Sequence, residues 1–168
     1  MPIPYINKTD DELFDYLNFV LIGWILLAIF PRWKYTINIA KMIGLCYAAL
    51  YVVLMYDSIV INPIDLGPKY PTIMDAFASL DGIHKMFSFK SAVFGGWVHY
   101  VVFDLWTGIY IVSDSVHCGM VSNIINQLIL VPILFFTMML GPTGLLFYHI
   151  IKTIYQLIFP TNNKIKSK

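Results

Sequence analysis

Two residues able to take part in proton chemistry, His99 and Asp104, lie within the apolar stretch GGWVHYVVFDLWTGIY at residues 95–110. An imidazole and a carboxylate can act as general acid and base, or as polar ties between packed helices. An ionised carboxylate in mid-bilayer costs about 2.5–3.5 kcal/mol, so Asp104 must face protein, find a partner or be protonated. Helical winding of about 100° per residue sets the two side chains roughly 140° apart. That offset favours two separate polar contacts over one acid–base pair, and a role in binding or proton chemistry stays open.

The helices that carry these residues are expected to lie in a membrane. Hydrophobic residues make up 58% of the 168-residue chain and charged residues only 12%, where a soluble domain has about 25% charged residues. We therefore expect one integral membrane domain, residues 1–168, of the all-α class. The net charge of +1 offers no basic surface for nucleic acid. The four histidines and two cysteines are scattered, so no metal site is expected.

Apolar runs predict four spanning helices, over about 14–30, 36–56, 92–112 and 123–140. Amphipathic spacing predicts two further helices in the membrane interface, at about 73–87 and 145–159. This pattern places both termini on one side of the membrane. The orientation is ambiguous, because the short first loop carries Arg32 and Lys34 while lysines on the other side are spread over longer segments.

Several residues are expected to hold the helices together. Gly44 and Ala48 form a small-xxx-small pair that allows a neighbouring helix to approach closely. Around Asp104, helical winding groups Trp97 and Thr107 near the same face. Gly141 and Pro142 predict a bend that ends the fourth span.

The segment after that bend carries a polar stripe. His149, Lys152, Thr153 and Gln156 recur at positions i, i+3, i+4 and i+7. The stripe predicts either an interfacial helix or an interface with a partner subunit.

The N-terminal sequence predicts where the protein is located. The segment MPIPYINKTDDELFDYL is acidic and lacks the features of a cleavable leader. A plastid transit peptide is therefore not expected, and the mitochondrial inner membrane is the favoured location.

Three segments together resemble the abscisic-acid-deficient-4-like family of small polytopic membrane proteins. They are WILLAIFPRW, which closes the first helix, GWVHYVVFDLW, which opens the third, and FFTMMLGPTGLLFY, which ends the fourth. The most specific part is W-x-H-x-x-x-x-D-L, here Trp97, His99, Asp104 and Leu105. The resemblance implies a role in plastid carotenoid chemistry, where the plant members are needed to form neoxanthin from violaxanthin, and it brings no established catalytic residue.

Two functions follow as expectations. The first is a non-catalytic accessory subunit of a larger membrane assembly, for example a respiratory-chain complex, with bound lipid and no cofactor. The alternative, implied by the resemblance, is an isoprenoid- or carotenoid-modifying enzyme. Forming an allene from an epoxide needs a base, for which Asp104 is the candidate, and an acid, for which His99 or a tyrosine is the candidate.

Overall fold

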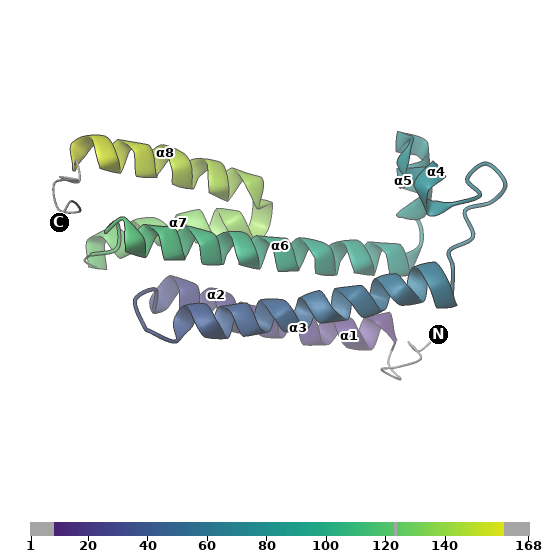
Figure 1. Ribbon diagram of the computed structural model, residues 1–168, viewed down its shortest axis with the longest axis horizontal. Coiled ribbons are helices and arrows are strands. Elements are labelled where there is room, and N and C mark those ends of the chain that lie inside the picture. Colours follow the sequence, from purple (N-terminus) through teal and green to yellow (C-terminus); the bar gives the residue numbers. More distant parts are fainter. Residues whose placement is uncertain (1–8, 123, 160–168) are drawn as a thin grey trace, which may run out of the picture. The chain divides into compact units, whose positions relative to one another are not determined.

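The computed structural model describes residues 9–122 and 124–159, and every regular element in these ranges is a helix (Figure 1). The described residues form two compact units. Unit 1 draws on Met1–Val20 and Ile43–Val102, and unit 2 on Leu21–Met42 and Phe103–Lys168. The all-α class expected from the sequence is confirmed for the described part of the chain.

The first helical run begins at a capping box. Thr9 caps α1 (Asp10–Tyr16), its hydroxyl accepting from the Glu12 backbone while the Glu12 side chain accepts from the Thr9 backbone. The helix continues through a short 3-10 segment, η1 (Leu17–Phe19), into α2 (Val20–Ile29). The connector that follows is closed by the Thr36 hydroxyl, which donates to the Phe30 carbonyl at 2.6 Å.

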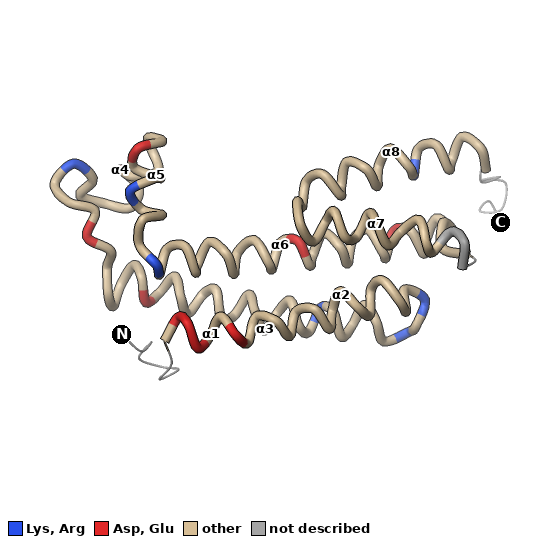
Figure 2. Tube along the Cα trace, turned by 180° about the vertical axis from the view of Figure 1, so that it is seen from behind, with Lys and Arg blue, Asp and Glu red and all other residues tan. Residues whose placement is uncertain are grey.

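The second helix, α3 (Thr36–Tyr56), has the bounds expected for the second apolar run and continues into one turn of π-helix, η2 (Asp57–Ile61). Two helical segments, Asp10–Ile29 and Thr36–Ile61, are long and apolar enough to cross a membrane. Figure 2 shows these helices largely free of charge along their middle parts, with charged residues gathered near helix ends and connectors.

The prediction of one helix over 73–87 is wrong, because two short helices occupy this range. They are α4 (Ile73–Phe77) and α5 (Leu80–Met86). Ser79 separates them in an extended conformation, and its hydroxyl accepts the Gly82 N–H at 3.1 Å, which starts the new helix. A Cβ at Gly82 would lie 2.3 Å from the Ala76 carbonyl oxygen, so the two helices meet at this glycine.

The longest helix, α6 (Lys90–His117), extends beyond the expected range of 92–112 at both ends. The SDSVH sequence continues the helix because the Ser113 hydroxyl bonds back to the Ile109 carbonyl at 2.7 Å, satisfying the side chain within the helix. Gly119, at φ 78°, turns the chain after the helix ends.

The last two helices form a hairpin within unit 2. They are α7 (Ile124–Leu140) and α8 (Pro142–Ile158). The break expected at Gly141 and Pro142 is present, but α8 begins at Pro142 rather than near residue 145, since proline is well suited to the first position of a helix. The helices approach so closely that a Cβ on Gly144 would lie 2.1 Å from the Thr137 hydroxyl oxygen.

Candidate functional site

The clearest hollow in unit 1 is an apolar groove of about 400 Å³. Its walls come from the end of α3, the π-helical turn, α4, α5 and the start of α6. A volume in this range fits a small-molecule site. Π-helical turns occur frequently at functional sites. The lining residues are Tyr51, Met55, Ser58, Ile59, Ile64, Ile73, Phe77, Met86, Phe87, Ala92, Gly96 and His99.

Two adjacent glycines of α6 let the walls of this groove approach the helix. A Cβ on Gly95 would lie 2.7 Å from the Met55 terminal methyl carbon, and one on Gly96 would lie 2.8 Å from the Phe87 ring. Any larger residue would push these side chains outward. The Gly-Gly pair in GGWVH therefore sets the width of the groove at α6.

Polar groups in the groove are few. The centroids of the His99 and Tyr51 rings lie 5.3 Å apart. Ser58, which adds a hydroxyl, is buried. Donors and acceptors of this kind can orient a hydroxyl, keto or epoxide oxygen at one point of an otherwise apolar ligand. No carboxylate is among the described residues that line the groove.

Asp104, the second residue of the predicted pair, lies in unit 2 and is only 6% exposed. Its carboxylate lies beside Gly141, where a Cβ would come within 2.3 Å of the carboxylate oxygen Oδ1. Gly141 is the N-cap of α8 and provides no side-chain cap. The first N–H groups of a helix have no partner within it, and their dipole stabilises a nearby negative charge by about 0.3–1 kcal/mol at exposed sites, up to ~2 kcal/mol in partly buried geometry. The position of Asp104 thus lowers the cost of its burial.

The other predicted packing residues have varied surroundings. Trp97 is about half exposed and stacks on Tyr100 with centroids 5.8 Å apart. The Thr107 hydroxyl donates to the Phe103 carbonyl of its own helix, so this bond joins no second helix. Gly44 is buried and Ala48 is half-buried.

A polar cluster at the end of α6 was not predicted from the sequence. The Asp114 carboxylate accepts hydrogen bonds from the Tyr148 hydroxyl and the Lys152 ammonium of α8. The side chains of Asp114 and Lys152 are 23% and 21% exposed. The sequence did contain a signal for this pair. Asp114 and Lys152 are the only charged residues between Leu105 and Asn163, and their charges are opposite.

This cluster shifts the pKa values of Asp114 and Lys152. Both residues lie after the span expected over 92–112. Burial alone would raise the pKa of Asp114, but the hydrogen bonds from Lys152 and Tyr148 outweigh it and the pKa lies below the ordinary 3.8. The hydrogen bond to Asp114 raises the pKa of Lys152 above 10.5. Both groups therefore carry their charges at neutral pH.

The stripe predicted as a partner interface is divided by this cluster. Lys152 is engaged with Asp114, while the Thr153 hydroxyl donates to the His149 carbonyl at 2.8 Å. His149 and Gln156 are exposed. An interface with another subunit stays a prediction. Within this unit Lys152 already forms an ion pair, and the His149 ring lies near the rings of Tyr110 and Tyr148.

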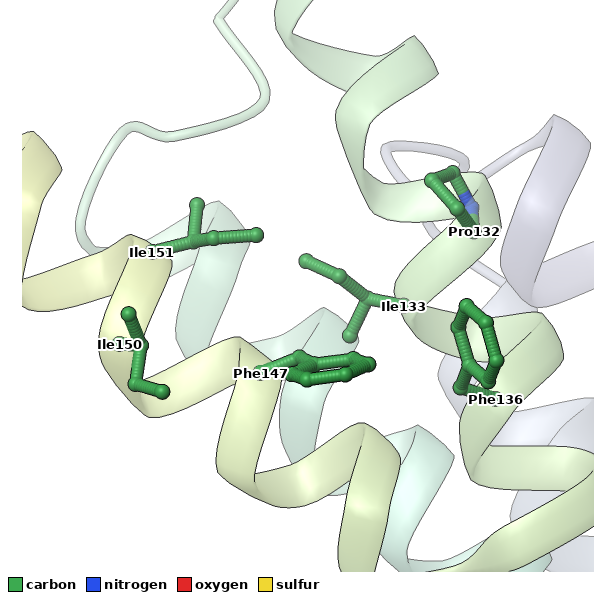
Figure 3. A pocket seen from close by; sticks show the side chains of 6 residues that line it. All are labelled: Pro132, Ile133, Phe136, Phe147, Ile150 and Ile151. Atoms are coloured by element: carbon green, nitrogen blue, oxygen red, sulfur yellow. The ribbon is translucent and has the colours of Figure 1, made fainter.

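A second hollow lies between the two arms of the α7–α8 hairpin (Figure 3). Its volume is about 140 Å³, and it is lined by Pro132, Ile133, Phe136, Phe147, Ile150 and Ile151. It is entirely apolar and smaller than most ligand sites. Within the described residues there is also no group of three or more His, Cys, Asp or Glu side chains placed to hold a metal ion. The groove of unit 1 is therefore the better candidate for a ligand.

The model of one known family, described as ABA DEFICIENT 4-like, matches residues 12–148. This range covers most of the chain, including the groove, Asp104 and the first turns of α8. Neither the comparison with curated proteins nor the comparison with solved structures finds a match.

Proposed function

The chain belongs to the ABA DEFICIENT 4-like family, and from this premise we propose that it is a membrane protein that binds an isoprenoid or carotenoid. The ligand would lie along the groove of unit 1. Its apolar chain would contact the methionine, isoleucine and phenylalanine side chains. An oxygen at its end group would be held by His99, Tyr51 or Ser58.

The observation that carries this proposal is the chemistry of the groove. About 400 Å³ of space is lined by apolar side chains with three polar groups, those of Tyr51, Ser58 and His99. A polyene that bears a single hydroxyl or epoxide at each end matches such a lining, since burying its chain is favourable by about 25 cal/mol per Å². A charged metabolite would find no carboxylate, lysine or arginine among the described residues that line the groove.

A matched pair of substitutions tests this site. Ile59 lines the groove, whereas its neighbour Val60 is not among the lining residues, and their exposed fractions are similar at 53% and 58%. The protein would be purified in mild detergent from a host that makes xanthophylls, and bound pigment measured by visible absorbance. We expect Ile59→Trp to reduce bound pigment several-fold and Val60→Trp to leave it unchanged. Equal loss in both variants, or no pigment in the wild type, would refute the proposal.

Catalysis on such a ligand is a separate hypothesis. An epoxide-to-allene conversion would need proton removal from carbon, with Asp104 as the candidate base, and acid assistance from His99. One observation counts against this hypothesis: His99 lines the groove, but Asp104 does not. Product formation by an Asp104→Asn variant in a complementation assay would exclude Asp104 as the base.

The accessory-subunit hypothesis remains as the second candidate. It rests on the exposed His149 and Gln156 of α8 and on the absence of a recognisable catalytic motif in the sequence. Migration of the endogenous protein as a small particle on a native gel would reject it. The family is associated with plastid membranes, which gives no support to a mitochondrial location.

Membrane insertion underlies both candidates. The two apolar segments, Asp10–Ile29 and Thr36–Ile61, are long enough to cross a bilayer. We expect α6 to cross as well, since its 28 residues extend about 42 Å. The four-span prediction further requires α7 to cross.

A further inference from the structure

We infer that α7 and α8 do not span the membrane but form a re-entrant hairpin, which enters and leaves on the side where α6 ends. This inference rests on the proposed membrane insertion of the chain. It departs from the four-span prediction, in which α7 crosses and α8 lies on the opposite surface. The evidence comes from the contacts of the hairpin within unit 2.

Three contacts place the hairpin along α6. The turn lies beside Asp104, since a Cβ on Gly141 would meet that carboxylate. Further along α8, Tyr148 and Lys152 bond to Asp114. Further still, the Tyr155 hydroxyl donates to the Gly119 carbonyl at 3.1 Å, just beyond the end of α6. Helix α8 therefore runs in the same direction as α6 and ends beside its C-terminal end (Figure 1).

The depth of the turn follows from helix geometry. Asp104 is 13 residues before His117, the last residue of α6, which corresponds to about 20 Å along the helix. The hydrocarbon core is about 30 Å thick. If α6 crosses, the turn lies inside the core and not at its far surface.

Polarity along the hairpin agrees with this depth. The turn sequence MLGPTGLLF, residues 139–147, has threonine as its one polar side chain. Met139, Leu140 and Leu146, which flank the turn, are each about half exposed. A turn at the far surface would be expected to carry charged residues or exposed tryptophan or tyrosine anchors. The only charge on either arm, Lys152, lies well away from the turn, beside Asp114.

The backbone of such a turn must be satisfied without water. Irregular backbone at membrane depth is tolerated only where protein covers it. Gly141 and Gly144 are both buried, and the Leu145 N–H donates to the Gly141 carbonyl at 3.2 Å. The close approach to Thr137 and Asp104 provides this cover, which explains the two glycines of GPTG.

The open end of the hairpin lies next to the first connector. The Gln127 side chain donates to the carbonyls of Ala28 and Ile29 at 3.2 and 2.8 Å, and Arg32 donates to the Ser122 carbonyl at 2.9 Å. A re-entrant path therefore puts the end of α8 on the same side as Arg32 and Lys34.

Single-cysteine labelling in sealed vesicles tests this path. Cys46 and Cys118 would first be replaced by serine, and one cysteine introduced at Ser122, Thr143 or Gln156. An impermeant thiol reagent would be applied from each side, with labelling in detergent as the reference. We expect positions 122 and 156 to react from the same side, and position 143 to react only after solubilisation.

The four-span path gives the opposite result. Positions 122 and 156 would react from opposite sides, and position 143 would react in intact vesicles. Either observation overturns the re-entrant hairpin. Alkaline carbonate extraction of the same vesicles tests membrane insertion itself. A protein that is not inserted can therefore be distinguished from an inserted protein whose hairpin follows a different path.

Discussion

The contact between α7 and α8 at Gly144 gives the sharpest prediction, because backbone atoms oppose any added side chain. A Cβ at this position would lie 2.1 Å from the Thr137 hydroxyl oxygen, 2.3 Å from its backbone nitrogen and 2.5 Å from its Cα. Cβ atoms essentially never come closer than 3.0 Å to other heavy atoms. A Gly144→Ala variant must therefore move the two helices apart by about 1 Å, which also loosens their other contacts.

We expect this substitution to destabilise the protein by about 3 kcal/mol, the upper end of the usual range for overpacking. That cost corresponds to a fall of about 6–12 °C in melting temperature for a chain of this size. The measurement is thermal unfolding in mild detergent, followed by aggregation or near-ultraviolet circular dichroism. Thr143→Ala, one residue away and half-exposed, serves as the matched control and should melt like the wild type.

A second substitution separates backbone from side-chain contact. Thr137→Ala removes the hydroxyl but leaves the backbone nitrogen in place, so it should not rescue Gly144→Ala. At Gly141 the obstructing atom belongs to the Asp104 side chain, so Asp104→Ala should partly relieve Gly141→Ala. Wild-type melting of Gly144→Ala, or full rescue by Thr137→Ala, would refute the close approach of the two helices.

Two further predictions concern polar groups. Asp114→Asn should cost about 1.5–3 kcal/mol at neutral pH, as expected for a hydrogen bond to a charged group. Because folding lowers the pKa of Asp114, its contribution is present above 3.8 and is lost as pH falls through the folded-state value. The melting temperatures of wild type and variant should therefore approach each other as the pH falls below 3.8 and through the folded-state pKa, and a constant difference over this range would contradict the ion pair with Lys152. His99→Leu should weaken binding of a hydroxylated polyene about 3- to 10-fold, the loss of one hydrogen bond, and leave a pure hydrocarbon polyene unaffected in a pigment titration; equal weakening of both would exclude a polar role for His99.

Much of the secondary structure could be predicted from the sequence. The predicted all-α class was confirmed for the described residues, the bounds of α3 agreed with the apolar run 36–56, and Gly141-Pro142 marked a break. These features are local, since helix propensity and proline or glycine act on their own segment. The split of residues 73–87 was missed because the Ser79 cap competes with a continuous amphipathic pattern.

Winding along one helix could separate the faces of His99 and Asp104, but it could not say what each face meets. Only the tertiary structure decided that His99 lies in the groove with Tyr51, and that Asp104 lies at the N-terminus of α8. The pairing of Asp114 with Lys152, 38 residues apart, was equally inaccessible. Helices that are apolar all round carry no stripe that marks their neighbours, so the sequence determined the helices of this protein while packing between them determined its candidate sites.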